Sequence, residues 1–388
     1  MKIGIFTNNY LPNPYGVTVA VERARSAMVE RGHRVYLFAP QWKGYTDLVP
    51  NIFRFPAIET AFRFRFPIAL PFSWKMRKVL QSLEFDIVHA HHPNVLGSVA
   101  MRWARKKKVP LVFTWHTLYN WYANFVPLLH PKLVAWIATR TAVTYANRAH
   151  RVIVPTESAK EIIVGWGVRE SSITVIPTGI DEALFAEARG EKIRQQFGIQ
   201  PKEPVLFLNC RLTEEKNPEF VFRAVMNILK TKEAHLIVVS DGYLMPKIRT
   251  YVQESGVADR VHFAGQVPQN EVKNYYAAAD IFVYSSLSET QGLVIAEAMY
   301  MRLPVVALDG SGVRDVVRHE DSGFLVSPEQ GEEAFALRVQ ALLGNQELRQ
   351  QMGVRGRKIV EENLTVAVCI EQTLNLYAEV IEIYRKSR

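Results

Sequence analysis

Short apolar runs alternate with amphipathic helical segments along nearly the whole chain, and this alternation restricts the fold more than any other feature. Six runs in the first half have the length and the flanking residues of strands: residues 2–7, 34–39, 52–55, 87–91, 111–115 and 151–155. Helical spacing separates them at residues 19–31, 73–83 and 96–107. Strands that alternate with helices predict parallel sheets with crossover helices on both faces.

The second half repeats this pattern. Strands are expected at residues 205–209, 234–240, 261–264, 281–284 and 305–307, with helices at 218–229, 245–255, 270–278 and 293–301 and a long final helix at 366–388. We therefore predict an α/β protein of two doubly wound, Rossmann-like domains, 1–180 and 181–388, with a linker within 178–203. Such sheets bind ligands at the carboxyl ends of their strands, so two facing edges are expected to form a cleft.

The composition fits this class and excludes several others. Of the 388 residues 48% are hydrophobic and evenly spread, which excludes disordered, collagen-like and coiled-coil chains. The two cysteines, Cys210 and Cys369, are far apart, which excludes a disulfide scaffold and favours a reducing cytosol. We expect neither a signal peptide nor a transmembrane segment, because the N-terminus runs into a strand and no apolar run reaches about 18 residues.

Charge is distributed unevenly between the two halves. The formal net charge of +9 combines a strongly basic half, 1–180, with a slightly acidic half, 181–388, and the tryptophans all lie in the first. This asymmetry predicts that one domain faces an anionic surface, with nucleic acid and a membrane leaflet as the two candidates.

Two motifs of the second half directly follow predicted strands. Glu289 and Glu297 flank a loop rich in Ser, Thr and Gly whose helix begins near Gly292, where backbone amides can hold an anion. Arg211 and Lys216 follow the strand at 205–209, and two cations at that edge suit a diphosphate. Each motif alone also fits an exposed turn with solvated charges, but their occurrence together favours a phosphate site.

These residues resemble the family 4 retaining glycosyltransferases, which have the GT-B fold. Matching segments cover nearly the whole chain: Ile176-Pro-Thr-Gly-Ile-Asp181, Val261-His-Phe-Ala-Gly265, Ala278-Ala-Asp280, and Glu297-Ala-Met299 followed by Leu303-Pro-Val-Val306. The resemblance implies that Arg211 and Lys216 hold the donor diphosphate, Glu289 the sugar hydroxyls and Glu297 the nucleotide ribose. The further donor-binding residues that it implies are Thr290, Gln291, Gly292, Leu293 and Val294, the last four through their amides. The resemblance also implies an acceptor-side domain at 1–180 and a donor domain at 181–388, with the final helix, about 366–388, packing back on the first domain.

Gly16 and four departures complete the comparison with the family pattern. Gly16, after the first strand, resembles the family's N-terminal glycine loop, which faces the diphosphate, so the resemblance implies that Gly16 binds the donor; an ordinary turn before a helix is the alternative. Cys210, Ser240 and Arg302 stand where relatives commonly have glycine, and Gln291 stands where they have phenylalanine. None of these changes removes a charged donor ligand, so the prediction of an enzyme stands.

One histidine follows a strand of the basic half. The resemblance places His116 near the donor sugar, where the imidazole would orient or polarise the sugar. The predicted catalytic residues are therefore His116, Glu289, Arg211 and Lys216. An aromatic row surrounds it: Trp115, Tyr119, Trp121 and Tyr122. Such a row is often core, but His116-Thr followed by aromatics, together with Glu289-Thr-Gln-Gly-Leu293, resembles the members that glycosylate diacylglycerol.

Two basic segments of the first half contain interleaved aromatic residues. Residues 54–78 carry six basic residues and one acidic residue, and residues 102–108 carry five basic residues. Arg and Lys beside Phe and Trp are typical of an interfacial membrane anchor, whereas a helix with a solvated basic side is the alternative. The residues expected at the membrane or the acceptor are Arg63, Arg65, Phe66, Trp74, Lys75, Arg77 and Lys78, with the four aromatics Trp115, Tyr119, Trp121 and Tyr122.

The sequence also bears on metals and cofactors. The run His89-Ala-His91-His92 has no carboxylate or cysteine nearby, and no Asp-x-Asp motif occurs, so we expect no metal and no cofactor besides a nucleotide-sugar co-substrate. We predict a metal-independent, retaining hexosyltransferase whose donor is a nucleotide sugar, UDP-glucose by resemblance. Its expected acceptor is a lipid in an anionic membrane, and we expect the protein to be peripheral on the inner face of the cell membrane. A soluble sugar or hydroxy-acid acceptor is the alternative, and a nucleic-acid-binding or scaffold protein the remote one.

Overall fold

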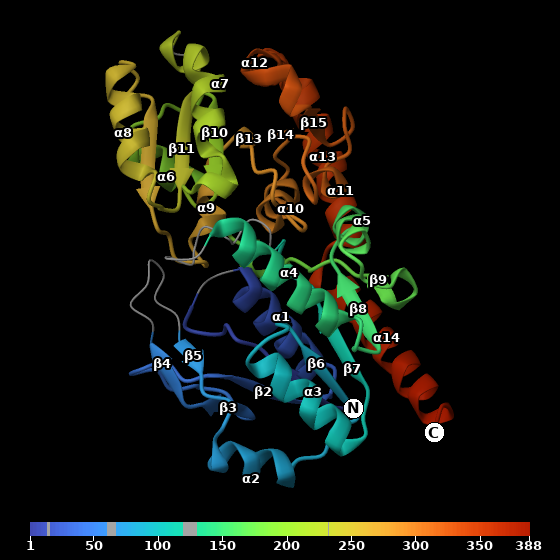
Figure 1. Ribbon diagram of the computed structural model, residues 1–388. Helices are drawn as coiled ribbons and strands as arrows, with labels where there is room; N and C mark the ends of the chain where they lie inside the picture. Colours follow the sequence, from blue (N-terminus) through green and yellow to red (C-terminus); the bar gives the residue numbers. More distant parts are fainter. Residues whose placement is uncertain (14–15, 60–66, 119–129, 232) are drawn as a thin grey trace. The chain divides into compact units, whose positions relative to one another are not determined.

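The computed structural model describes residues 1–13, 16–59, 67–118, 130–231 and 233–388, which divide into two units (Figure 1). The first unit comprises Met1–Gly179 and Val366–Arg388, and the second comprises Ile180–Thr365. Each unit is built on its own parallel sheet. The prediction of an α/β protein with two Rossmann-like domains is confirmed.

The sheet of the first unit has seven parallel strands in the order β3-β2-β1-β6-β7-β8-β9. In chain order these strands are β1 (Lys2–Phe6), β2 (Arg34–Pro40), β3 (Ile52–Phe55), β6 (Ile87–Ala90), β7 (Leu111–Thr114), β8 (Arg151–Val154) and β9 (Ile173–Val175). A two-stranded antiparallel sheet pairs β4 (Ala57–Glu59) with β5 (Pro67–Ala69). Strands of three residues leave no recognisable periodicity in the sequence, so the sequence does not predict them.

Helices cover both faces of this sheet because its strands are apolar on both sides. One face carries α2 (Trp74–Ser82), α3 (Leu96–Lys107), α4 (Pro131–Ala146) and α5 (Glu157–Gly165) over side chains such as Phe6 and Phe113. The other face carries α1 (Gly16–Glu30) and the C-terminal α14 (Val366–Lys386) over Ile3, Ile5 and Val112. Alternate residues of one strand thus enter two different cores.

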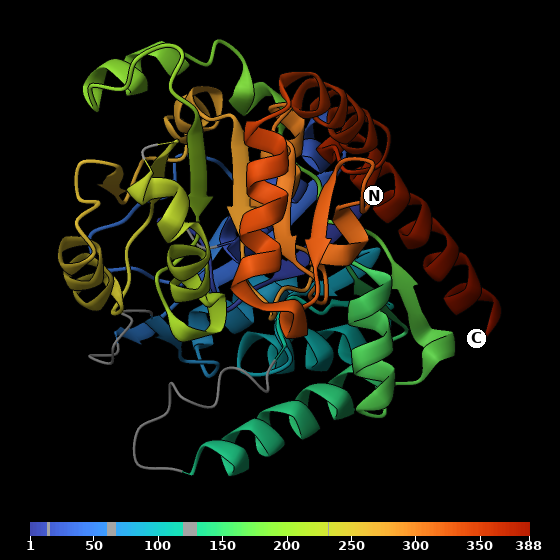
Figure 2. The same cartoon turned by 90° about the horizontal axis from the view of Figure 1, so that it is seen from above.

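The sheet of the second unit has six parallel strands in the order β12-β11-β10-β13-β14-β15. They are β10 (Val205–Asn209), β11 (His235–Val239), β12 (Val261–Gly265), β13 (Ile281–Tyr284), β14 (Val305–Leu308) and β15 (Gly323–Val326). Its helices are α6 (Gly190–Gln196), α7 (Pro218–Lys230), α8 (Met245–Glu254), α9 (Val272–Ala278), α10 (Leu293–Tyr300), α11 (Val313–Val316), α12 (Gly331–Leu343) and α13 (Gln346–Asn363). In Figure 2 the orange α12 lies over the strands of this sheet.

The division between the two units falls inside residues 178–203, where a linker is expected. The units divide between Gly179 and Ile180, and the residues that follow form a 3₁₀ turn, Glu182–Phe185, and α6 within the second unit. Ile193 of α6 is buried in the core of that unit, which anchors the segment. The Gly and charged residues of this segment therefore mark turns between packed elements. Among the described residues, every helix falls short of the length and apolarity that a membrane crossing needs.

Candidate functional site

The loops that follow β10 and β13 bring a lysine and a carboxylate together at the carboxyl edge of the second sheet. Lys216 Nζ donates a hydrogen bond to Glu289 Oε1 over 2.5 Å, and the Tyr284 hydroxyl donates to the same oxygen over 2.6 Å. The Lys216 and Glu289 side chains are 17% and 13% exposed, so this ion pair is largely shielded from water. Two predicted site residues are thus in direct contact, and Tyr284 is a neighbour that the sequence analysis missed.

Burial and pairing act in opposite directions on these groups. Burial alone would raise the pKa of Glu289, but the charge of Lys216 and hydrogen bonds from Lys216, Tyr284 and Ser286 outweigh it, so the pKa lies below its usual value. Burial and the adjacent carboxylate raise the pKa of Tyr284 well above that of an ordinary phenol. At neutral pH the cluster therefore consists of a carboxylate, an ammonium and a neutral phenol.

The second predicted cation is paired as well. Arg211 Nη2 lies 3.1 Å from Glu215 Oε1, and the Thr213 hydroxyl donates to that oxygen over 2.7 Å. The backbone carbonyl of Glu215 accepts a hydrogen bond from the Ser288 hydroxyl, which joins this loop to the one after β13. Both cations thus face carboxylates, and an incoming anion must compete with Glu215 and Glu289 for them.

Helix α10 begins beside this cluster. Gly292 precedes it with φ +80°, a left-handed conformation that glycine adopts without strain. The amides of the first turn, including Leu293 and Val294, have no partner within the helix and point toward its N-terminal end. Thr290 and Gln291 complete the loop between Glu289 and Gly292, with Gln291 buried. This arrangement can bind an anion such as a phosphate.

Glu297 lies on the second turn of α10 and is 5% exposed. Its carboxylate accepts a hydrogen bond from the Tyr276 hydroxyl over 3.0 Å, and Asn209 Nδ2 donates to that hydroxyl oxygen over 3.0 Å. Tyr276 comes from α9 and Asn209 ends β10, so three elements fix the orientation of one carboxylate. Tyr276 is the second neighbour that the sequence analysis missed, because the residue pattern of its helix does not indicate that the helix faces the site.

The loop that carries Glu289 is held in place by contacts with the loop that follows β14. The Ser311 hydroxyl donates to the Glu289 carbonyl over 2.8 Å. Gly312 has φ +74°, and a Cβ there would lie 2.7 Å from the Gln291 nitrogen and the Glu289 carbonyl oxygen. Only glycine allows the two loops to approach this closely, so the site requires Gly312. The sequence analysis did not identify this residue.

At two of the positions where relatives commonly have glycine, the backbone has a conformation that favours glycine. Ser240 has φ +99° and Arg302 has φ +61°, both in the left-handed region that favours glycine. Cys210 is buried, which raises the pKa of its thiol to about 12, so it is a neutral core group. The backbone of this chain therefore keeps a conformation suited to glycine at Ser240 and Arg302.

In the first unit His116 lies two residues after the end of β7, where it is partly exposed. His116 Nε2 lies 2.8 Å from Nδ1 of the buried His91, which follows β6. Burial lowers the pKa of His116 to about 3, so its imidazole is neutral at physiological pH.

Gly16 is the first residue of α1 and is exposed, and a Cβ there would meet open space.

An exposed basic and aromatic surface lies on α2 and α3 of the first unit. Phe72 and Trp74 are 83% and 78% exposed, Arg77 stacks over the Trp74 ring and Arg102 over the Phe72 ring. Lys75 and Lys78 are also exposed on α2. Helix α4 adds exposed apolar side chains that the sequence analysis did not single out: Leu133, Trp136 and Ile137.

Trp115 requires a correction. It is fully buried, its indole Nε1 donates to the Thr117 carbonyl over 2.7 Å, and its ring packs near Phe113 and Trp166. The expectation that it contacts a membrane or an acceptor is wrong, because its side chain points into the core of the first unit. The other predicted surface residues Arg63, Arg65, Phe66, Tyr119, Trp121 and Tyr122 lie outside the described residues.

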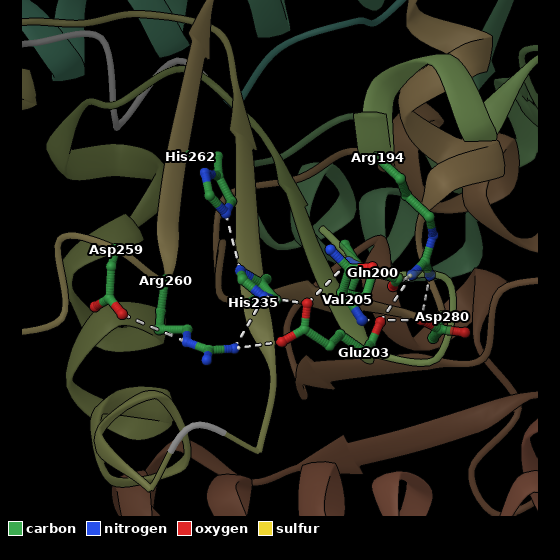
Figure 3. A network of polar contacts seen from close by, with 9 residues as sticks. All are labelled: Arg194, Gln200, Glu203, Val205, His235, Asp259, Arg260, His262 and Asp280. Atoms are coloured by element: carbon green, nitrogen blue, oxygen red, sulfur yellow. Dashed lines mark hydrogen bonds and ion pairs between the residues drawn. The ribbon is translucent and has the colours of Figure 1, made fainter. Parts of the chain in front are cut away.

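A second polar network lies at the opposite, amino-terminal edge of the second sheet (Figure 3). Glu203 accepts hydrogen bonds from Arg260 over 3.0 Å and from the Gln200 amide over 2.8 Å, and His235 Nδ1 lies 2.9 Å from His262 Nε2. Hydrogen bonds from the Gln200 amide, Arg260 and His235 lower the pKa of Glu203 to about 2. Within the described ranges, no group of three or more His, Cys, Asp or Glu side chains is arranged to hold a metal. This network joins strand ends and lies away from the loops described above.

Comparison with known proteins agrees with these motifs. Residues 14–184 match the family model "Glycosyltransferase Family 4", and residues 190–359 match "Glycosyl transferases group 1". The alpha-monoglucosyldiacylglycerol synthase of Streptococcus pneumoniae is 31% identical over 320 residues, covering 79% of this chain and 71% of that protein. The N-acetyl-alpha-D-glucosaminyl L-malate synthase of Bacillus anthracis is 25% identical over 393 residues, covering 98% of this chain and 97% of that protein.

Solved structures show the same fold. The crystal structure of Anabaena Alr3699/HepE in complex with UDP-glucose superposes with a TM-score of 0.79 at 21% identity and covers 98% of this chain and 100% of that chain. The sucrose-phosphate synthase of Thermosynechococcus elongatus superposes with a TM-score of 0.79 at 20% identity, covering 98% and 99%. The two parallel-sheet units are those of the GT-B fold, and the chain belongs to the family 4 glycosyltransferases.

Proposed function

We propose that the protein transfers a hexose, glucose, from a UDP-linked nucleotide sugar to a membrane lipid such as diacylglycerol, with retention at the anomeric carbon and without a metal. The observation that carries the proposal is the cluster of Lys216, Glu289 and Tyr284 beside the start of α10. It combines a cation for a phosphate with a carboxylate for sugar hydroxyls. The proteins of S. pneumoniae and Acholeplasma laidlawii named alpha-monoglucosyldiacylglycerol synthase support the choice of sugar and acceptor.

In the proposed reaction the departing diphosphate gains negative charge. Arg211, Lys216 and the amides at the start of α10 would stabilise that charge, and Lys216 would be shared between the phosphate and Glu289. Glu289 would position the sugar and Glu297 the ribose. We assign no nucleophile: a phosphate oxygen of the donor would take the acceptor proton, and His116 would orient or polarise the sugar.

The lipid acceptor is supported by the surface of the first unit. Residues 87–156 contain nine basic residues and no acidic one. The exposed Phe72 and Trp74 lie among cations that would reach anionic headgroups, and each Lys or Arg near such a surface contributes about 1 kcal/mol. We therefore propose a peripheral location on the inner face of the cell membrane.

A soluble acceptor is the second candidate. The B. anthracis relative is named for transfer to L-malate, and its similarity spans nearly both chains. A scaffold or nucleic-acid-binding role has less support, because such a role would not require Lys216 and Glu289 to be buried against each other.

The test is transfer of labelled sugar to lipid vesicles, with UDP-glucose, UDP-galactose and GDP-mannose as donors and L-malate as the soluble acceptor. We expect UDP-glucose and vesicles containing diacylglycerol and an anionic lipid to give product. Transfer to L-malate with equal or higher efficiency would support the soluble acceptor instead.

A charge-reversal pair separates membrane binding from donor chemistry. Reversal of Lys75, Arg77 and Lys78 to Glu should abolish flotation with anionic vesicles and reduce lipid transfer, while slow hydrolysis of the donor persists. The matched control reverses three exposed lysines of the second unit, Lys192, Lys202 and Lys230, with the same change in net charge. Equal flotation of both variants and the parent protein would refute the membrane surface.

A further inference from the structure

Three buried or partly buried imidazoles form a row at the carboxyl edge of the first sheet. The ring centroids of His89 and His91 are 4.1 Å apart, and those of His91 and His116 are 5.1 Å apart. Burial lowers the pKa of His89 to about 3, and burial with the neighbouring histidines lowers the pKa of His91 well below its usual value. Together with His116 these imidazoles are neutral at physiological pH, so each ring carries one N–H and one nitrogen lone pair.

The contact between His91 Nδ1 and His116 Nε2, 2.8 Å long, has two possible arrangements. In the first, His91 donates from Nδ1, and the single proton of His116 then lies on its own Nδ1. In the second, His116 donates from Nε2, and the proton of His91 then lies on its Nε2. The two arrangements give His116 opposite tautomers, and therefore different chemistry on the edge that carries Nδ1.

The surroundings of His91 Nε2 distinguish the two arrangements. His91 is 5% exposed, and its Nε2 is buried without a hydrogen-bond partner among the described residues. His91 lines a cavity of about 60 Å³ together with Arg23, and no Asp or Glu is among the residues that line it. The lining also includes the hydroxyls of Thr114, Thr178 and Thr373, but none of them reaches Nε2, so an N–H there would be left without an acceptor. The positive charge of Arg23 favours a lone pair on Nε2 over an N–H. A water in this cavity would accept from Arg23 and donate to Nε2.

We propose that His91 is a positioning residue that fixes His116 as its Nδ1–H tautomer by donating a hydrogen bond from His91 Nδ1 to His116 Nε2. His116 then offers a proton donor at Nδ1 and has no lone pair there to act as a base. In the proposed transfer reaction, on which this consequence rests, His116 donates a hydrogen bond to an oxygen of the sugar.

The C-terminal helix helps to hold the row in place. The Tyr377 hydroxyl of α14 lies 2.5 Å from His89 Nδ1, and His89 Nε2 lies 2.6 Å from the Thr114 hydroxyl. With both ring nitrogens engaged, His89 has a fixed orientation, and the His91 ring packs against it at an interplanar angle of 37°. The His91 ring is therefore held with Nδ1 toward His116.

The tautomer can be read directly by NMR on the full chain with ¹⁵N-labelled histidine. Two-bond ¹H–¹⁵N spectra distinguish protonated from unprotonated ring nitrogens, and loss of one signal set in His116→Asn identifies His116 among the ten histidines. We expect its Nδ1 to be protonated and its Nε2 unprotonated at pH 7. A protonated Nε2 would overturn the proposal, whether or not the protein transfers glucose to lipid.

A matched pair of variants tests the role of His91. In His91→Leu the hydrogen bond is lost, and we expect a mixed His116 tautomer and a kcat about tenfold lower with the donor KM unchanged. His91→Asn can donate from nearly the same place and should recover most of that loss. An unchanged Nδ1–H tautomer in His91→Leu, or equal kcat for both variants and the parent, would contradict the proposal. Thermal unfolding of both variants identifies any loss that is due to misfolding, and the NMR result on the parent protein does not depend on them.

Discussion

Replacement of Lys216 by Met tests the energetics of the candidate site most directly. The substitution keeps the length of the side chain and removes its charge, so Glu289 remains buried with Tyr284 and Ser286 as its remaining donors. Loss of one partner from a buried ion pair costs about 3–5 kcal/mol, and since these side chains are 17% and 13% exposed we expect about 2–3 kcal/mol. For a unit of this size that corresponds to a fall in Tm of about 5–10 °C.

The assay is urea and thermal unfolding of the parent, Lys216→Met, Glu289→Gln and the double variant at pH 7. Glu289→Gln should cost less, about 1 kcal/mol, because an unpaired lysine can extend toward water. In the double variant the buried charge is absent, so its cost should lie well below the sum of the two single costs. Additive costs would refute the interpretation of a shielded ion pair.

The pH dependence gives an independent check on the same pair. In the parent the pKa of Glu289 is lowered, so its contribution to stability is fully present above the unfolded value of about 4.3 and is lost as pH falls through the folded value. In Lys216→Met burial dominates, and the pKa of Glu289 should rise. At low pH the Glu289 carboxyl is protonated, so the cost of burying an unpaired carboxylate disappears. The difference in free energy of unfolding between parent and variant should therefore narrow from pH 7 to pH 4. A constant difference would contradict this reasoning.

Three further predictions concern the donor site, the metal dependence of transfer and the strain of two residues with positive φ. Glu297→Gln should lower kcat/KM for the nucleotide sugar about tenfold to a hundredfold with little change in Tm, because charged hydrogen bonds contribute about 1.5–3 kcal/mol; unchanged kinetics would remove Glu297 from the donor site. EDTA should leave the transfer rate largely intact, and complete loss that Mn²⁺ restores would refute the metal-free mechanism. Ser240→Gly and Arg302→Gly should each raise stability by about 1 kcal/mol, since both residues have positive φ; lower urea midpoints would show that their side chains contribute more than the strain costs.

The sequence alone was sufficient for the fold class and for most strands of both sheets. Apolar periodicity and flanking Gly, Pro and Asn are local properties, so they survive without knowledge of tertiary contacts. The same reasoning placed Arg211 and Lys216 after β10 and Glu289 after β13, because carboxyl ends of parallel strands share one edge. Elements with weak or short patterns, such as β4, β5 and α6, were missed.

Tertiary structure decided which of those residues touch one another and which side chains reach the surface. Lys216 and Glu289 are 73 positions apart, and no local pattern shows that they form an ion pair with Tyr284 as a third member. Trp74 and Trp115 both lie in the basic half beside polar residues, yet one is 78% exposed and the other is fully buried. Periodicity assigns a residue to a face of its own element, whereas burial depends on which other element covers that face, and only the folded chain determines that.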